Sequence, residues 1–187
     1  MRSTDRRIFL AAVVIALLAL GGVAQSEVRY EELPNFHEVN SRLYRGAQPK
    51  TGGIAKLAAL GIKTVLNLRR EDDDTRAEAA AAQAAGLRYF NVGMPGTSKP
   101  SDEQINRALA IINSPENQPV FVHCKRGADR TGTVIACYRI LKDGWTASEA
   151  KKEAGQYGMW KTEFGMKHYI EDFYARHKDD TRPTDAR

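Results

Sequence analysis

Cysteine is scarce in this sequence of 187 residues, in which Cys124 and Cys137 are the only two. Two cysteines allow at most one disulfide. If a helix begins near Thr131, Cys137 lies roughly 9 Å along its axis, whereas bridged Cα atoms lie within about 7 Å of each other. We therefore expect no disulfide, with Cys137 a buried apolar residue and Cys124 a free thiol.

Clusters of like charge are almost absent as well. The chain has 28 Lys and Arg against 23 Asp and Glu, a net charge of +5, and the two signs are interspersed except around residues 123–132. Nucleic-acid-binding surfaces concentrate basic residues, so this pattern argues against a nucleic-acid partner. Internal repeats are also missing. The composition, 42% hydrophobic and 27% charged, is that of an ordinary globular protein with one domain and short additions.

A single long hydrophobic run is present, at the N-terminus. Arg2, Arg6 and Arg7 precede 17 apolar residues, 8–24, and the chain then turns polar. This order predicts that residues 1–24 are a signal peptide, or a retained membrane anchor at the short limit of length. A buried N-terminal helix is the third alternative. In the first two cases the rest of the chain is exported, either to a periplasmic or other extracytoplasmic space or held at the membrane through residues 8–24.

The remaining chain alternates strand-like and helix-like segments, which predicts an α/β fold with a mostly parallel central sheet flanked by helices. We expect a lead-in segment at 25–40, a single domain at 41–177 and a polar tail at 178–187. Ser101 and Thr146 are expected to cap helices. The expected strands are 42–49, 62–68, 87–94 and 118–124, and the expected helices are 52–61, 70–86, one after Ser101, 131–144, 147–155 and 164–177.

Residues 123–132, HCKRGADRTG, lie where the strand at 118–124 meets the next helix. A helix N-terminus presents unpaired N–H groups and a partial positive charge, so this loop can bind a phosphate-sized dianion. The same field favours the thiolate of Cys124, which predicts a nucleophile at neutral pH. Arg130 is expected at the mouth of the loop, where its planar guanidinium can hold two phosphate oxygens.

Other residues of this stretch have narrower expected roles. Gly127 allows the backbone to curl without a Cβ. Thr131 can donate its hydroxyl to the sulfur, and His123 can orient the loop from behind. Lys125 and Arg126 can contact further phosphates or raise the local potential, unless they are only solvated surface charge.

The stretch VHCKRGADRTG, residues 122–132, resembles the signature of cysteine-dependent protein tyrosine and dual-specificity phosphatases: His, Cys, five residues, Arg, then Ser or Thr. The element order from Leu43 to His177 resembles the small dual-specificity branch, and LYRGAQP at 43–49 resembles a segment of bacterial members. This implies a single phosphatase-like domain with its phosphate-binding loop between a strand and a helix. It also implies hydrolysis through a phosphocysteine, without metal or another cofactor. The implied catalytic and substrate-binding residues are Cys124, Arg130, Lys125, Arg126, Gly127, Ala128 and Thr131.

The resemblance implies a phosphorylated partner but leaves three functions open. The first is hydrolysis of phosphotyrosine or mixed protein phosphosites. The second is hydrolysis of a phosphoinositide or inositol phosphate, because CKRGAD at 124–129 also resembles phosphoinositide phosphatases. The third is a phosphate-binding module without turnover. The presence of both the nucleophile and the arginine argues against this third function.

A proton donor for the leaving group is harder to place. The dual-specificity branch usually has an aspartate on a loop well before the cysteine, but the matching window, YFNVGMP at 89–95, contains no acid. Asp129 matches an aspartate of myotubularin-type lipid phosphatases, although it could instead fix Arg130 or a neighbour through a salt bridge. Asp102 is the other candidate, unless it only complements a helix N-terminus.

Overall fold

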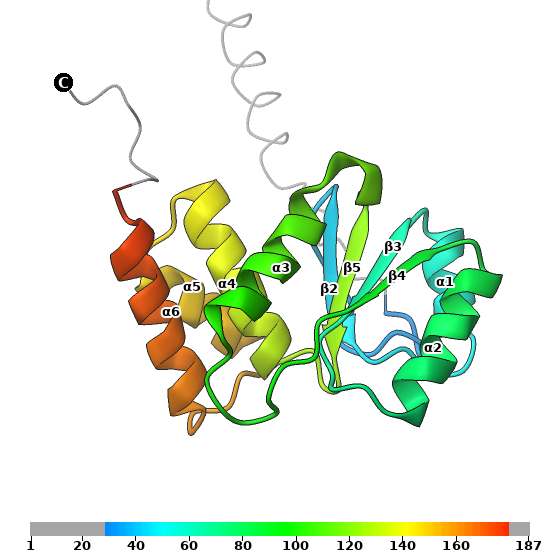
Figure 1. The fold of residues 1–187 in the computed structure, drawn as a ribbon, viewed down its shortest axis with the longest axis horizontal. Coiled ribbons are helices and arrows are strands. Elements are labelled where there is room, and N and C mark those ends of the chain that lie inside the picture. Colours follow the sequence, from blue (N-terminus) through cyan, green and yellow to red (C-terminus); the bar gives the residue numbers. More distant parts are fainter. Residues whose placement is uncertain (1–28, 180–187) are drawn as a thin grey trace, which may run out of the picture.

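A five-stranded sheet forms the middle layer of the structure (Figure 1). The computed structural model describes residues 29–179. The strand order is β1-β2-β5-β3-β4, with β1 antiparallel to β2 and all other neighbours parallel. This arrangement confirms the mostly parallel α/β sheet that the sequence predicts. The strands are β1 (His37–Asn40), β2 (Leu43–Ala47), β3 (Thr64–Asn67), β4 (Arg88–Asn91) and β5 (Val120–Cys124).

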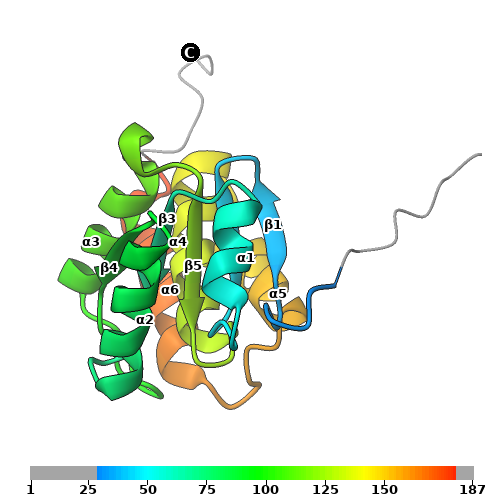
Figure 2. The same cartoon turned by 90° about the vertical axis from the view of Figure 1, so that its right-hand side faces the viewer.

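Helices cover both faces of the sheet. In Figure 1, α1 and α2 lie to the right of the strands and α3 to α6 lie to the left, and Figure 2 shows α1 and α2 in front of the sheet. The expected helices are all present, with small differences at their ends. They are α1 (Gly53–Ala59), α2 (Asp73–Ala84), α3 (Asp102–Asn113), α4 (Asp129–Asp143), α5 (Ala147–Gln156) and α6 (Phe164–His177), with a short 3₁₀ helix, η2 (Pro115–Asn117).

Strand β5 contributes to both hydrophobic cores, because successive side chains of a strand point to opposite faces. Val120, Val122 and Cys124 pack in the larger core on the side of α3 to α6, and Phe121 packs in the smaller core on the side of α1 and α2. All residues of β5 are buried. Burial on both faces explains why this strand is a continuous apolar run in the sequence.

Side-chain caps set the beginnings of several helices. The Ser101 side chain accepts from the Gln104 N–H, and the Gln104 side chain bonds back to the Ser101 N–H. Thr146 and Glu149 form the same capping box at α5. Both caps confirm the sequence prediction, since a Ser or Thr followed three residues later by Glu or Gln favours a helix start.

The segment expected as a lead-in contributes a strand that the sequence analysis did not predict. Residues His37–Asn40 form the edge strand β1, which pairs with β2. Just before it, Leu33 is buried in the smaller core. The strand has only four residues and lies at the sheet edge, so its alternation is too short to stand out in the sequence.

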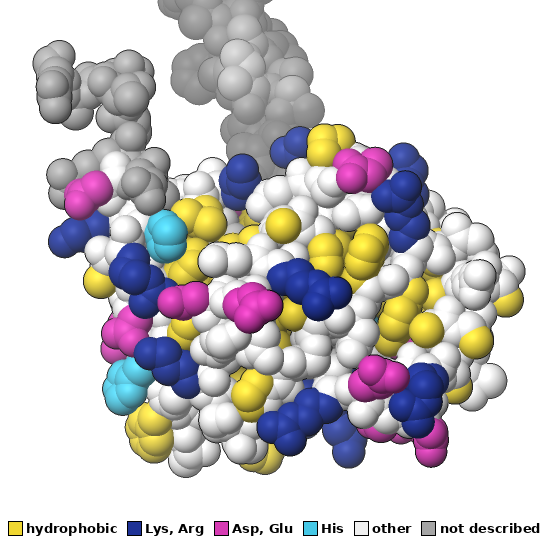
Figure 3. Space-filling view, viewed as in Figure 1, with side chains coloured by type: hydrophobic (Ala, Val, Ile, Leu, Met, Phe, Trp, Pro, Cys, Tyr) yellow, Lys and Arg dark blue, Asp and Glu magenta, His cyan; other side chains and the backbone are white. Residues whose placement is uncertain are grey.

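The predicted signal peptide or anchor at 1–24 lies outside the described residues, as does most of the predicted tail. Within residues 29–179, no helix combines the length and the hydrophobicity that a bilayer crossing requires. On the face shown in Figure 3, Lys and Arg lie among Asp, Glu and neutral side chains rather than in one block. Local groups of cations therefore matter more than the total charge.

Candidate active site

The predicted phosphate-binding loop lies between the carboxyl end of β5 and the N-terminus of α4. Cys124 is the last residue of β5 and Asp129 is the first of α4, so residues 125–128 form a tight turn over the helix N-terminus. Cys124 is 2% exposed, and both it and Cys137 are free thiols, as expected. Ala128, at the N-cap, supplies no capping side chain. The first N–H groups of α4 are therefore available to an anion at the loop.

Neighbouring segments hold three consecutive carbonyls of this loop. The Gln48 N–H donates to the Lys125 carbonyl (3.4 Å). The Asn35 side-chain amide donates to the carbonyls of Arg126 (3.1 Å) and Gly127 (3.3 Å). Because the C=O and N–H of a trans peptide point in opposite directions, these bonds turn the following N–H groups toward the mouth of the loop.

Two glycines bring the loop directly against strand β2. Gly127 has a φ of 69°, and a Cβ at this position would lie 2.4 Å from the carbonyl group of Gly46. Gly46 in turn faces the ring of Phe121, which a Cβ would approach to 2.6 Å. Gly127 therefore needs both properties of glycine, the positive φ and the absence of a Cβ. The segment LYRGAQP supplies the backbone against which the loop packs.

His123 orients the loop from the opposite face of the sheet. Its Nε2 lies 2.7 Å from a carboxylate oxygen of Glu78, and its Nδ1 lies 3.3 Å from the Cys124 carbonyl. Asn67 donates to the same Glu78 oxygen (3.1 Å), and burial followed by the charge of Glu78 raises the pKa of the neighbouring Tyr89. The sequence analysis did not single out Glu78, although it is the only acid on the buried face of α2.

Arg130 lines a cleft beside the loop. The cleft has a volume of about 370 Å³, and its lining includes Arg69, Arg70, Asp72 and the loop at 94–98. The Arg130 guanidinium donates to a backbone carbonyl at the end of β3 (3.4 Å), which places it between β3 and the loop. Three arginines thus meet at the predicted mouth of the site, and two of them were not expected there.

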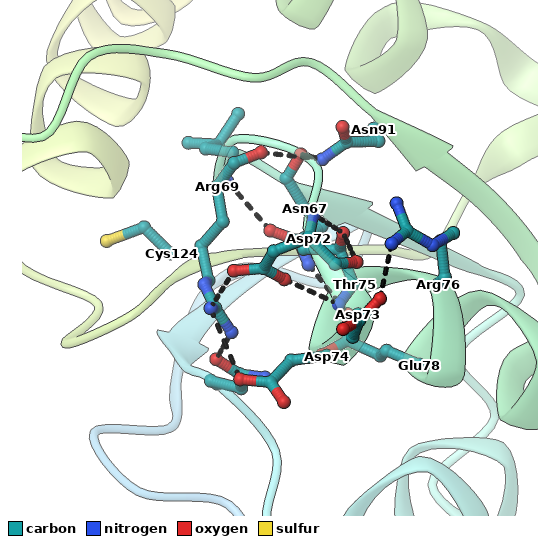
Figure 4. Close-up of polar contacts among 12 residues, drawn as sticks. Asn67, Arg69, Asp72, Asp73, Asp74, Thr75, Arg76, Glu78, Asn91 and Cys124 are labelled. Carbon is teal, nitrogen blue, oxygen red and sulfur yellow. Dashed lines mark hydrogen bonds and ion pairs between the residues drawn. The ribbon is translucent and has the colours of Figure 1, made fainter.

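The arginines of this cleft differ in how their charge is compensated. Arg69 donates to Asp72 (2.5 Å) and to Asp74 (3.4 Å), as Figure 4 shows. Cys124 appears beside this group with its sulfur directed away from the two carboxylates. Arg70 is exposed and forms no ion pair within residues 29–179. An anion in the cleft would therefore meet the uncompensated charges of Arg70 and Arg130.

The outer face of the loop is organised by Arg126. Its guanidinium stacks on Trp160, 3.9 Å from the ring centre, and forms an ion pair with Asp129. The second oxygen of Asp129 accepts from the Trp160 N–H (3.0 Å). Both oxygens of this buried carboxyl are therefore engaged, which supports its alternative role of fixing a neighbour. Lys125 remains exposed.

Two other carboxyls bear on the question of the proton donor. Asp102 accepts from the Tyr169 hydroxyl (2.7 Å) and from Arg176 (2.9 Å), so it connects α3 to α6 and does not line the cleft of Arg130. Glu163 is 5% exposed, and burial, followed by the charge of Asp129, raises its pKa. A carboxyl that keeps its proton to higher pH suits proton donation. Glu163 does not line the cleft of Arg130, but it is close enough to Asp129, the first residue of α4, to feel its charge, which makes Glu163 a candidate that the sequence did not indicate.

Thr131 is placed beside the loop but does not bond to it. Its side chain is fully buried, and its hydroxyl has no hydrogen-bond partner among residues 29–179. The bond predicted between this hydroxyl and the sulfur of Cys124 is therefore not formed here, and its role in the reaction stays a prediction.

Comparison with known proteins decides the family. A family model described as "DSP-PTPase phosphatase fused to NAD+ Kinase" matches residues 20–172. The chain belongs to this family. It is a dual-specificity-type, cysteine-dependent phosphatase, as its signature implies.

Relatives of this phosphatase differ in the substrates that their names give. Dual specificity protein phosphatase TpbA of Pseudomonas aeruginosa is 29% identical over 158 residues, 79% of this chain and 70% of TpbA. Inositol diphosphatase DSP2 of Oryza sativa is 30% identical over 146 residues, 74% of this chain and 69% of DSP2. The solved catalytic core of the PP-IP phosphatase SIW14 of Saccharomyces cerevisiae has a TM-score of 0.67 at 26% identity, covering 80% of this chain and 95% of that one.

A first prediction concerns the contact between the loop and β2. Gly127→Ala should reduce kcat/KM by about a hundredfold, because the new Cβ must displace the loop from the Gly46 backbone. Gly61→Ala is the matched control. Gly61 also has a positive φ, 81°, but its Cβ would meet nothing within 4 Å. The control should lose about 1–2 kcal/mol of stability and keep its activity. Equal activity losses in the two variants would contradict the packing argument.

A second prediction separates proton donation from positioning. A general acid contributes about 10²-fold or more to expulsion of a basic alkoxide and much less to expulsion of an aryl oxide. If Glu163 is the donor, Glu163→Gln should slow alkyl phosphates far more than aryl phosphates. Asp129→Asn, which loosens Arg126, should slow both to a similar extent. The opposite pattern in the two variants would assign donation to Asp129 and exclude Glu163.

Proposed function

We propose that this phosphatase hydrolyses phosphomonoesters of proteins, at phosphotyrosine or mixed phosphosites, through a phosphocysteine on Cys124. The observation that carries the proposal is the loop at 124–130. It combines a buried free thiol, N–H groups turned toward the mouth and an uncapped helix N-terminus. A tetrahedral phosphate dianion matches the charge of this site and its N–H donors.

The reaction follows from these groups. The Cys124 thiolate attacks phosphorus while the ester oxygen leaves and takes up a proton, and water then cleaves the S–P bond to release phosphate and the thiolate. The loop N–H groups and Arg130 bind the equatorial oxygens, where charge is redistributed in both transition states. Lys125, Gly127 and Ala128 contribute to the same cradle.

A third prediction tests this activity. Cys124→Ser should abolish hydrolysis of an aryl phosphate in reducing buffer, because an alcohol at this position is a far weaker nucleophile than a thiolate. Cys137→Ala should remain active, since Cys137 lies on α4 about two turns beyond the loop. Absence of turnover by the unmodified protein would instead favour a phosphate-binding module.

A second candidate function is hydrolysis of an inositol phosphate or diphosphate, or of a phosphoinositide headgroup. The cleft that joins Arg130 to Arg69 and Arg70 supports it, because a second phosphate next to the reacting one would meet the uncompensated charge of Arg70. A phosphate leaving group is also less basic than an alkoxide and needs less protonation, which agrees with a cleft whose single carboxylate, Asp72, is bound to Arg69. The similarity to relatives named inositol diphosphatases also supports this second candidate function.

A fourth prediction distinguishes the two substrate classes. Arg70→Ala should raise the KM for an inositol diphosphate by about tenfold, the loss expected for one charge-assisted contact of about 1.5 kcal/mol, and leave the KM for an aryl phosphate unchanged. Arg107→Ala, an exposed arginine on α3, is the control. An unchanged KM for the diphosphate in the Arg70 variant would remove the physical basis of this candidate.

We also propose that the phosphatase acts outside the cytoplasm, through export directed by residues 1–24. The support is the order of arginines, apolar run and polar return in the sequence. N-terminal sequencing of the protein from soluble and membrane fractions separates cleavage from a retained anchor. A full-length chain in the cytosolic fraction would contradict export.

A further inference from the structure

Arg45 is the most deeply buried charged side chain near the loop. It is 1% exposed and lies on β2, in register with Val122 of β5. Paired residues of neighbouring strands point to the same face, and so do residues two apart on one strand. The side chains of Arg45 and Cys124 therefore lie on the same face of the sheet, on adjacent strands.

The contacts of Arg45 are directed at the loop and leave its charge uncompensated. Its guanidinium donates to the Gly127 carbonyl (3.2 Å) and stacks on Tyr157, 4.1 Å from the ring centre. Its Nε and second Nη atoms are buried and find no acceptor within residues 29–179, and no carboxylate there forms an ion pair with it. A buried cation without a partner is costly, so its presence requires an explanation.

The charged groups around Arg45 identify where its counter-charge can come from. Burial lowers the pKa of Arg45 to about 10, so it is cationic at neutral pH, while Glu153, Tyr157 and Cys124 act in the opposite direction. Glu153 is already bound by Arg139 (2.9 Å), whose own charge repels Arg45. Tyr157 meets the guanidinium with the face of its ring and supplies no carboxylate. The anion left to balance Arg45 is the one that forms at the loop.

We infer that Arg45 is a positioning residue whose buried cation is a fixed counter-charge beneath the loop, for both the Cys124 thiolate and the phosphate bound there. This inference rests on the proposed phosphatase site. Arg130 would bind the phosphate from the mouth, whereas Arg45 acts from behind through the backbone of Gly127 and through its charge. Because the guanidinium is excluded from water, its field is screened less than that of a surface cation.

The experiment uses a pair of variants that separates charge from hydrogen bonding. Arg45→Gln removes the charge and keeps an N–H donor, and Arg45→Lys keeps the charge. Arg176→Met is the control, because Arg176 also lies over aromatic rings but on α6, bound to Asp102. Two properties are measured on folded protein, as judged by near-UV circular dichroism. They are the dissociation constant of tungstate, a tetrahedral oxyanion, and the pH dependence of kcat/KM for an aryl phosphate.

Arg45→Gln should weaken tungstate binding by about tenfold and move the rising limb of the pH profile up by about one unit, since a nearby cation was favouring the anionic forms. Arg45→Lys and Arg176→Met should keep the limb in place. A limb that stays in place in Arg45→Gln would overturn the inference. If that variant does not fold, a displaced limb in Arg45→Lys overturns it equally, because the charge is still present.

Failure of the inference and failure of the proposed function are distinguishable. Tungstate binding requires no turnover. If Arg45→Gln loses tungstate binding and the unmodified protein is inactive, the counter-charge role of Arg45 is supported and the proposed enzymatic activity is rejected. Turnover by the unmodified protein with equal tungstate affinity in all variants would keep the enzyme and reject the role of Arg45.

Discussion

The orientation of three peptide groups in the loop after β5 is the constraint on which the rest of the site depends. A loop of this length has no regular hydrogen-bonding pattern of its own, so its carbonyls must be bound from outside if its N–H groups are to face an anion. Asn35, Gln48 and Arg45 provide those donors. The absence of a Cβ at Gly127 lets the backbone come close enough to β2 for these bonds to form.

This constraint explains why segments far apart in the sequence are needed for a motif that looks self-contained. The N-terminal segment before β1 and strand β2 hold the loop from one side. Glu78 of α2 holds His123 from the other face of the sheet, and Trp160 holds Asp129 near the start of α4. The loop is therefore rigid because it is bound on several sides, and a preorganised set of N–H groups stabilises transition-state charge without rearrangement.

The parts of the site that are contiguous in the chain could be predicted from the sequence, and the parts that depend on register could not. Strand β5, the loop and α4 follow one another, so composition and helix physics alone indicate Cys124 and Arg130. Arg45 acquires its role only when β2 pairs with β5, and Asn35 only when the segment before β1 lies against the end of β2. No local pattern in the sequence records either arrangement. Strand β1 was missed because four edge residues show no clear alternation. The sequence indicated Asp129, but it did not show that this carboxylate binds Arg126 and the N–H of Trp160, which lies in the segment after α5.

The central claim is that the loop binds a phosphate dianion around the Cys124 sulfur, and protection of this thiol from alkylation tests that claim most directly. Iodoacetamide reacts with thiolates, and Cys124 is the one cysteine left in a Cys137→Ala background, so modification of that variant reports on Cys124. We expect added phosphate to slow the alkylation of Cys124, because a dianion bound in the loop covers the sulfur and adds negative charge beside it. An alkylation rate that is the same with and without phosphate would contradict the account.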